Sequence, residues 1–337
     1  MEPMIETEAA DEAHAAAIEA LPQSLADLLD GVERVIVGQR AAAEAMFHAL
    51  LARGHCLLLG VPGTGKTLLV RTFARLLGLP FGRIQFTPDL MPSDITGTEI
   101  LRETDAGRRE FVFARGPVFT NVLLADEVNR TPPKTQAALL EAMQELTVTA
   151  GGQVHRLAEP FVVLATRNPI EQEGTYPLPE AQLDRFLFEI PIGYPSLDDE
   201  RRVVAGHSFA PLDPLEPLFF GGELQNLRAA VAAIPASANV VDYAVRLARA
   251  TRPEDPSAPE FVRDWLRWGA SPRASQFLIV AARARAACQG RFNVAVADVR
   301  ALAPWTLRHR LILSYRAEAD GQDAEAIVRR LLDEVAE

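Results

Sequence analysis

A glycine-rich stretch at residues 60–67 has the residue types and the spacing needed to hold phosphate groups. It reads Gly-Val-Pro-Gly-Thr-Gly-Lys-Thr and fits the pattern G-x-x-x-x-G-K-[ST] at every fixed position. Glycines let backbone N–H groups close around phosphate oxygens, and the start of the next helix adds partial positive charge. Lys66 is expected to reach the β- and γ-phosphates of ATP, and Thr67 to offer its hydroxyl to Mg²⁺. ATP and Mg²⁺ are therefore the expected cofactors, and the expected contact residues of this stretch are Gly60, Pro62, Gly63, Thr64, Gly65, Lys66, Thr67 and Leu68.

Two adjacent acids, Asp126 and Glu127, end an apolar run at residues 121–125. A continuous apolar run is typical of a strand buried on both faces of a parallel sheet, and such sheets bind ligands at the carboxyl ends of their strands. Asp126 is expected to hold Mg²⁺ through water, and Glu127 to polarise the attacking water as a general base. A strand that merely ends in solvated acids is the alternative, which the phosphate loop upstream disfavours.

Other candidates are less specific. Asn168 follows an apolar run at residues 161–165 and could orient the lytic water, although Asn before Pro is also an ordinary turn former. Arg273 lies in the first turn of a helix that Ser271 and Pro272 open, where it could close over a nucleotide or lie on a surface. The corner formed by Val37, Gly38 and Gln39 could wall the adenine or simply connect two helices.

The elements that position these residues alternate between strands and helices up to about residue 194. Apolar runs at residues 56–59, 83–86, 121–127, 161–165 and 187–190 predict strands, and residues 68–77 predict the helix after the phosphate loop. Two hairpins are expected, at residues 98–113 and 147–156. From residue 195 onward the pattern is of amphipathic helices. The sequence therefore predicts an acidic, mobile arm at 1–23, an α/β nucleotide-binding domain with a parallel sheet at 24–194, and a smaller all-helical lid domain at 195–337.

Composition excludes several classes of function. With 48% hydrophobic and 23% charged residues, this chain of 337 residues is an ordinary globular one, and we expect a cytoplasmic protein without a membrane span. Cys56 and Cys288 are far apart, which gives no disulfide framework, and the six histidines lack the spacing of a zinc site. The formal net charge of −11 disfavours nucleic acid as the main partner.

The motifs resemble those of the MoxR family of AAA+ ATPases over residues 35–313. Besides the phosphate loop and the two acids, the tracts that carry this resemblance lie at residues 85–90, 92–97, 132–136, 168–186 and 269–274. The resemblance implies a P-loop AAA+ domain with a helical lid, assembled into a ring, commonly hexameric, with ATP at the subunit boundaries. It also implies that the hairpin at 98–113 is the helix-two insert, and that both hairpins face the pore of the ring.

The same resemblance assigns roles to three residues. Asn168 matches the first sensor, Arg273 the second sensor, and Arg185 the arginine finger, a guanidinium supplied across an interface to the γ-phosphoryl oxygens. Arg130 lies in a comparable tract after the acidic strand and is the alternative finger. The tryptophans Trp265 and Trp268 depart from the family pattern and mark either a partner surface or packing.

The resemblance further implies an ATPase that remodels or matures client protein complexes in the manner of a chaperone. Cofactor or metal insertion, with a von Willebrand factor A domain protein as partner, belongs to the same expectation. Three alternatives stay open: a DNA-dependent AAA+ motor, a nucleotide-switched scaffold with little hydrolysis, and a small-molecule phosphotransferase. The net negative charge disfavours the DNA-dependent motor. The presence of Glu127 and Asn168 disfavours a scaffold with little hydrolysis, and the lack of an acceptor-pocket motif disfavours the phosphotransferase.

Overall fold

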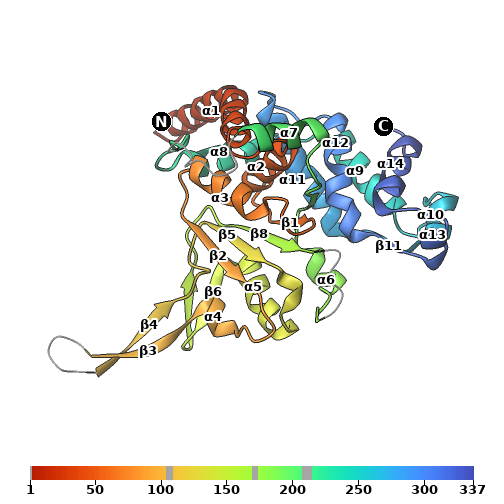
Figure 1. Ribbon diagram of the computed structural model, residues 1–337. Helices are drawn as coiled ribbons and strands as arrows, with labels where there is room; N and C mark the ends of the chain where they lie inside the picture. The colour runs from red at the N-terminus through yellow and green to blue at the C-terminus, as the bar shows by residue number, and fades with distance from the viewer. Residues whose placement is uncertain (1, 104–108, 169–173, 207–214) are drawn as a thin grey trace.

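The computed structural model describes residues 2–103, 109–168, 174–206 and 215–337, and Figure 1 shows the arrangement of its elements. A five-stranded parallel sheet forms the centre of the first domain, in the order β2-β5-β8-β1-β9. Its strands are β1 (Cys56–Leu59), β2 (Phe81–Gln85), β5 (Val122–Asp126), β8 (Val162–Arg167) and β9 (Phe188–Pro191). The predicted parallel α/β sheet is therefore confirmed.

The side chains of the sheet alternate between two hydrophobic cores because successive residues of a strand face opposite sides. On β5, Val122 and Leu124 pack into the core shared with α1 (Glu2–Glu33), α2 (Arg40–Leu51) and α3 (Lys66–Leu76). Leu123 and Ala125 face the other core, which α5 (Pro133–Glu145) covers together with the short α4 (Pro92–Thr96). Both faces of the sheet are thus buried, so a ligand would reach the sheet at the carboxyl ends of its strands.

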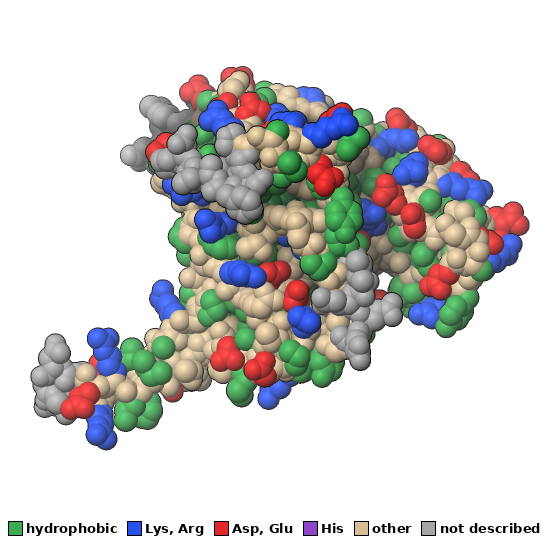
Figure 2. All heavy atoms as spheres, viewed as in Figure 1, with side chains coloured by type: hydrophobic (Ala, Val, Ile, Leu, Met, Phe, Trp, Pro, Cys, Tyr) green, Lys and Arg blue, Asp and Glu red, His purple; other side chains and the backbone are tan. Residues whose placement is uncertain are grey.

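Two antiparallel hairpins interrupt this domain, as the sequence predicts. The longer one joins β3 (Gly97–Glu103) to β4 (Arg109–Arg115) and projects away from the sheet (Figures 1 and 2). The shorter one joins β6 (Thr147–Ala150) to β7 (Gln153–Arg156). On the long hairpin, Leu101 lies opposite Phe111, and both side chains are exposed.

After β9, the described residues are helical apart from a short antiparallel pair, β10 (Leu266–Trp268) with β11 (Ile312–Leu313), which the sequence does not predict. A two-residue strand such as β11 is too short to give a periodic signal. The helices described after β9, which include those of the lid, are α7 (Leu197–Gly206), α8 (Glu223–Ala233), α9 (Ala238–Ala250), α10 (Glu260–Trp265), α11 (Pro272–Cys288), α12 (Val296–Leu307), η2 (Arg308–Arg310), α13 (Tyr315–Ala319) and α14 (Ala324–Glu334).

The N-terminal segment differs from the solvated arm that its composition predicts. Residues 2–23 belong to α1, and Ile18 and Leu21 are buried in the core that the sheet shares with the lid. These two side chains face inward one turn apart, and the alanines around them hide that pattern in the sequence. The last turns before Ser24 are therefore a packed part of the fold.

The tryptophan-rich segment has one packed and one exposed member. Trp265 lies edge-on to Phe261, and the Arg330 guanidinium sits 4.1 Å from the Phe261 ring centroid and 5.2 Å from that of Trp265. Trp268 is exposed. Packing therefore accounts for Trp265 and leaves Trp268 on the surface.

Candidate nucleotide site

The phosphate loop joins β1 to α3 and has the shape that bound phosphate requires. Gly63 and Gly65 have φ angles of +84° and +78°, and a Cβ built on either would meet no heavy atom within 4 Å. This left-handed backbone favours glycine, and the space beside it is open. At Gly60 a Cβ would lie 2.4 Å from the carbonyl oxygen of Ile192, so the close approach of the two segments also requires glycine. The residues present therefore fit a nucleotide triphosphate.

Lys66 lies at the first turn of α3, and its ammonium is held by the loop itself. Nζ donates hydrogen bonds to the carbonyl oxygens of Gly60 and Val61, over 2.8 and 2.7 Å. Partial burial lowers the pKa of Lys66, while the negative charges of Asp126 and Glu127 act to raise it. The structure thus brings Lys66 near the two acids that the sequence predicts as its partners.

Asp126, the last residue of β5, is engaged through both carboxylate oxygens. Thr166 Oγ1 donates to Oδ1 over 2.6 Å, and the Arg83 guanidinium donates to Oδ2 over 2.7 Å from Nη2 and 3.2 Å from Nε. In the described part of the chain no group of three or more His, Cys, Asp or Glu side chains could hold a metal ion. Mg²⁺ suits such a site when phosphate oxygens and water complete its coordination, because it usually binds through one or two protein oxygens plus substrate.

Glu127 follows directly in a left-handed conformation, with φ +58° and ψ +49°. Its N–H donates to Thr166 Oγ1 over 2.8 Å, which fixes this turn to the end of β8. One carboxylate oxygen, Oε2, accepts from Gln85 Nε2 over 2.8 Å and from Arg130 Nη1 over 2.9 Å. The predicted general base is therefore held by side chains from β2 and from η1 (Val128–Arg130).

Sequence reasoning missed three members of this cluster: Arg83, Gln85 and Thr166. Arg83 and Gln85 are two residues apart on β2 and therefore share one face of the sheet, and Gln85 is paired in register with Asp126. Arg83 Nη2 also donates to Gln85 Oε1, so a continuous chain of hydrogen bonds links Asp126 to Glu127. Strand alternation together with the strand order would have revealed it.

Arg185 and Arg273 lie beside a second group of hydrogen bonds, which joins the lid to Asp184. Ser271 Oγ caps α11 by accepting from the Arg273 N–H over 3.1 Å, and it donates to Asp184 Oδ2 over 2.8 Å. Arg310 donates to the other oxygen of Asp184 over 2.8 Å. Within the described ranges, neither the Arg185 nor the Arg273 guanidinium makes a hydrogen bond or ion pair. Arg185 and Arg273 thus lie where the lid contacts Asp184. In the described ranges, no hydrogen bond or ion pair joins either guanidinium to the phosphate loop.

Two further predictions concern the ends of the site. Asn168 is buried at the end of β8, and residues 169–173 of the tract that follows it lie outside the described residues. The corner at Val37 and Gly38 precedes α2, with Gly38 at φ +81°. Gly38 N–H donates to Glu33, and Arg202 on α7 donates to both Glu33 and Asp199. The corner is therefore joined through Glu33 to α7, the helix that follows β9. The chain between β9 and α7 includes Ile192, which lies against Gly60.

Family models match both domains. The model described as "ATPase family associated with various cellular activities (AAA)" matches residues 55–188, and the model described as "AAA lid domain" matches residues 261–331. None of the described helices is both long and apolar enough to cross a membrane.

Several known proteins are similar along most of the chain. The Chaperone MoxR1 of Mycobacterium tuberculosis is 49% identical, with 90% of this chain and 80% of that protein covered. The Protein MoxR of Paracoccus denitrificans is 33% identical, with 89% and 91% covered. A crystal structure of a candidate ATPase from Cytophaga hutchinsonii superposes with a TM-score of 0.88 at 39% identity, covering 98% of this chain and 99% of that one.

Proposed function

The chain belongs to the MoxR family of AAA+ ATPases, and from this membership we propose that it hydrolyses ATP at the subunit boundaries of a ring, commonly hexameric, to remodel protein clients. The observation that carries the proposal is the convergence of Lys66, Asp126 and Glu127 at the carboxyl edge of the sheet. This is the edge at which parallel sheets bind ligands.

The proposed chemistry assigns one task to each residue. The N–H groups of residues 63–67 and Lys66 bind the phosphates, and Thr67 and Asp126 hold Mg²⁺. When bound, Mg²⁺ would supply positive charge that offsets the charge of the phosphates. Glu127 takes a proton from the attacking water, and Asn168 helps to orient that water. Gln85 and Thr166 support Glu127 through its carboxylate and its N–H.

We propose Arg185 as the arginine finger that one subunit offers to the ATP of its neighbour. The alternative, Arg130, already pairs with Glu127 of its own chain at 2.9 Å, which favours a role beside its own general base. Arg185 is half-buried next to Asp184, in a segment held by the lid. Arg273 enters the same proposal as the second sensor. The bond between Ser271 and Asp184 links its helix to residues 180–187 around Arg185, here called the finger segment.

A protein client fits the projecting β3–β4 hairpin. Leu101 and Phe111 lie opposite each other and are exposed on one face of the hairpin, and Ile100 is exposed on the other face. Hydrophobic side chains gather along the projecting hairpin (Figure 2). The relative from M. tuberculosis is named a chaperone, which supports client remodelling here. A partner with a von Willebrand factor A domain, and cofactor insertion as the purpose, are proposals that derive from the family resemblance alone.

The proposal is tested by measuring Mg²⁺-dependent phosphate release by the wild type and by Glu127→Gln. Turnover should fall by about 10²–10⁴-fold in the variant while ATP still binds, because the general base is lost and the phosphate loop is intact. Equal turnover in both proteins would overturn the assignment of Glu127. Strong stimulation by DNA at moderate salt would instead favour the DNA-dependent motor.

A further inference from the structure

The segment that carries Arg185 is bonded to the lid of its own chain by Ser271, His309 and the buried Arg310, and Arg310 makes several of these bonds. Arg310 donates from Nε to the Asp184 carboxylate over 2.8 Å. Its Nη2 donates to the backbone carbonyl oxygens of Asp184 and Phe186, over 3.0 and 2.6 Å. One guanidinium therefore binds the residue before Arg185 and the residue after it.

Arg310 also makes contacts within the lid itself. Its side chain is only 2% exposed. Its remaining bonds run to the carbonyl oxygens of Thr306 and Leu187 and to His309 Nε2, the last over 2.7 Å. Its guanidinium also lies over the Phe277 ring, 5.1 Å from the ring centroid. Burial lowers the pKa of Arg310 to about 10, with Asp184 acting in the opposite direction, so the group stays charged at neutral pH. A buried charge is costly unless it is fully hydrogen-bonded, and here the partners belong to the two elements that it joins.

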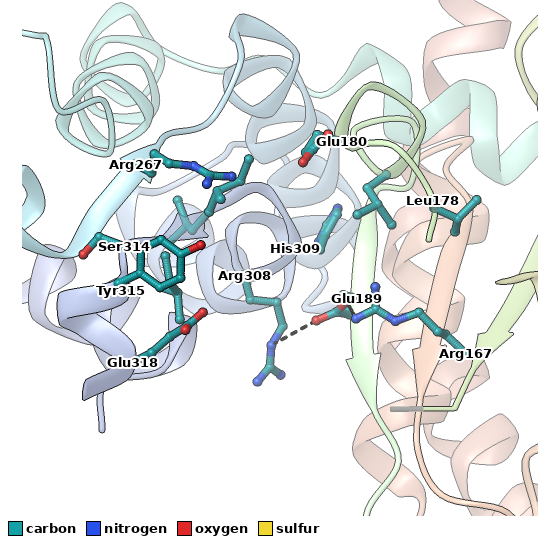
Figure 3. A pocket seen from close by; sticks show the side chains of 14 residues that line it. Arg167, Leu178, Glu180, Glu189, Arg267, Arg308, His309, Ser314, Tyr315 and Glu318 are labelled. Atoms are coloured by element: carbon teal, nitrogen blue, oxygen red, sulfur yellow. Dashed lines mark ion pairs between the residues drawn. The ribbon is translucent and has the colours of Figure 1, made fainter. Parts of the chain in front are cut away.

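Another side of this segment borders a cavity. Leu183 and Glu180 line a cavity of about 490 Å³, which also borders the lid residues Arg308 and His309 (Figure 3). Arg308 points toward Glu189 across this space, with 3.6 Å between the charged groups. Phe186 and Leu187 anchor the end of the segment in the two hydrophobic cores, and Arg310, Ser271 and His309 supply its polar contacts from the lid.

Asp184 completes the arrangement. Both of its carboxylate oxygens accept hydrogen bonds from the lid, one from Ser271 and one from Arg310. The adjacent Arg185 is not paired with this carboxylate. The lid thus binds the Asp184 carboxylate, next to Arg185 in the chain, and leaves the Arg185 guanidinium available.

We propose that Arg310, acting with Asp184, is a positioning residue for Arg185. The lid of each subunit then sets the geometry of the arginine that this subunit offers to its neighbour. This inference rests on the proposed function, in which Arg185 acts across the boundary. A reacting group displaced by about 1 Å can lose about 10²-fold in rate, so loss of Arg310 should lower turnover by that order.

Arg310→Met removes the donors and keeps an apolar side chain of similar length. The matched control is Arg308→Met on the same turn, since Arg308 pairs with Glu189 and Glu325 rather than with the finger segment. The affinity of each variant for a fluorescent ATP analogue should equal that of wild type, because no bond from Arg310 reaches the phosphate loop. If Arg310→Met does not bind the analogue, Asp184→Asn takes its place, because it keeps the size and one acceptor of that side chain.

The decisive experiment mixes subunits before assembly. Glu127→Gln subunits are inactive in their own site but carry an intact Arg185, so they can supply a finger to a neighbour. Arg310→Met (or Asp184→Asn) and Arg185→Ala should each have low turnover alone, and each should regain turnover when mixed with Glu127→Gln. Rescue of Arg185→Ala without rescue of the Arg310 or Asp184 variant would overturn this inference and leave the shared site standing. Failure to rescue Arg185→Ala would overturn the shared site itself, and the inference with it.

Discussion

Gln85 at the end of β2 donates a hydrogen bond of 2.8 Å to the carboxylate of Glu127, the residue that follows β5. The same carboxylate oxygen accepts from Arg130, so two side chains from different elements restrain the proposed general base. A base that is held in one orientation loses less entropy when it takes the proton.

Gln85→Ala should therefore lower kcat and leave the KM for ATP unchanged. We expect a loss of about 10-fold, smaller than the 10²–10⁴-fold expected for removal of the base itself. Steady-state phosphate release over a range of ATP concentrations measures both constants. A rise in KM at constant kcat would mean that Gln85 serves binding and not the orientation of Glu127.

Arg83 is predicted to weaken Mg²⁺ binding. Its guanidinium lies 2.7 Å from the Asp126 carboxylate, so it competes with a cation for that oxygen. The pair is partly exposed, and such pairs contribute at most about 1 kcal/mol, or roughly 5-fold in affinity. Arg83→Met should lower the Mg²⁺ concentration for half-maximal turnover by up to that factor, whereas Arg71→Met on the exposed side of α3 should not change it. An increased Mg²⁺ requirement in Arg83→Met would contradict this account.

Substitution of Thr166, near the end of β8, is expected to lower both turnover and stability. Its hydroxyl donates to Asp126 and accepts from the N–H of Glu127, whose backbone is left-handed. Thr166→Val keeps the shape but leaves that partly buried N–H without its acceptor, at a cost of about 1 kcal/mol. We expect turnover to fall by at least about 10-fold and unfolding to occur at lower urea, with Thr166→Ser close to wild type in both. Turnover and stability of Thr166→Val equal to those of wild type would show that the turn at Glu127 does not need the Thr166 hydroxyl.

His55 predicts how stability depends on pH. Its Nδ1 accepts from the Val163 N–H over 3.0 Å, and Nε2 lies 3.0 Å from the Met143 carbonyl oxygen, so only the neutral ring fits. Burial lowers the pKa of His55 from 6.5 to about 4. Between these values the unfolded chain binds a proton that the folded chain does not, so stability falls as the pH is lowered from 6.5 toward 4.

The measurement is the free energy of unfolding in urea at several pH values, for wild type and His55→Asn. One such proton contributes a slope of about 1.4 kcal/mol per pH unit, and the variant should lose that contribution. Parallel pH curves for the two proteins would show that His55 does not titrate in this window.

The sheet was predictable because its strands are short apolar runs bounded by glycine, proline and polar residues, and β1 has the predicted bounds. The phosphate loop and the two acids were predictable because their spacing is local. The contact between Arg310 and Asp184 spans 126 residues and has no local signature. Arg83 was missed for a related reason, since its importance depends on β5 lying beside β2, which only the strand order reveals.

The central claim is that each ATP site is completed by a second subunit. ATP turnover per subunit, measured as protein concentration is raised from high dilution, tests it most directly, with Arg185→Ala beside wild type and Arg329→Ala as an exposed control on α14. The account predicts that turnover per subunit climbs with concentration in the wild type and the control. In Arg185→Ala it should stay low, by about 10³-fold or more, while ATP still binds. Turnover that is constant from the most dilute sample onward, and indifferent to Arg185, would contradict the shared site.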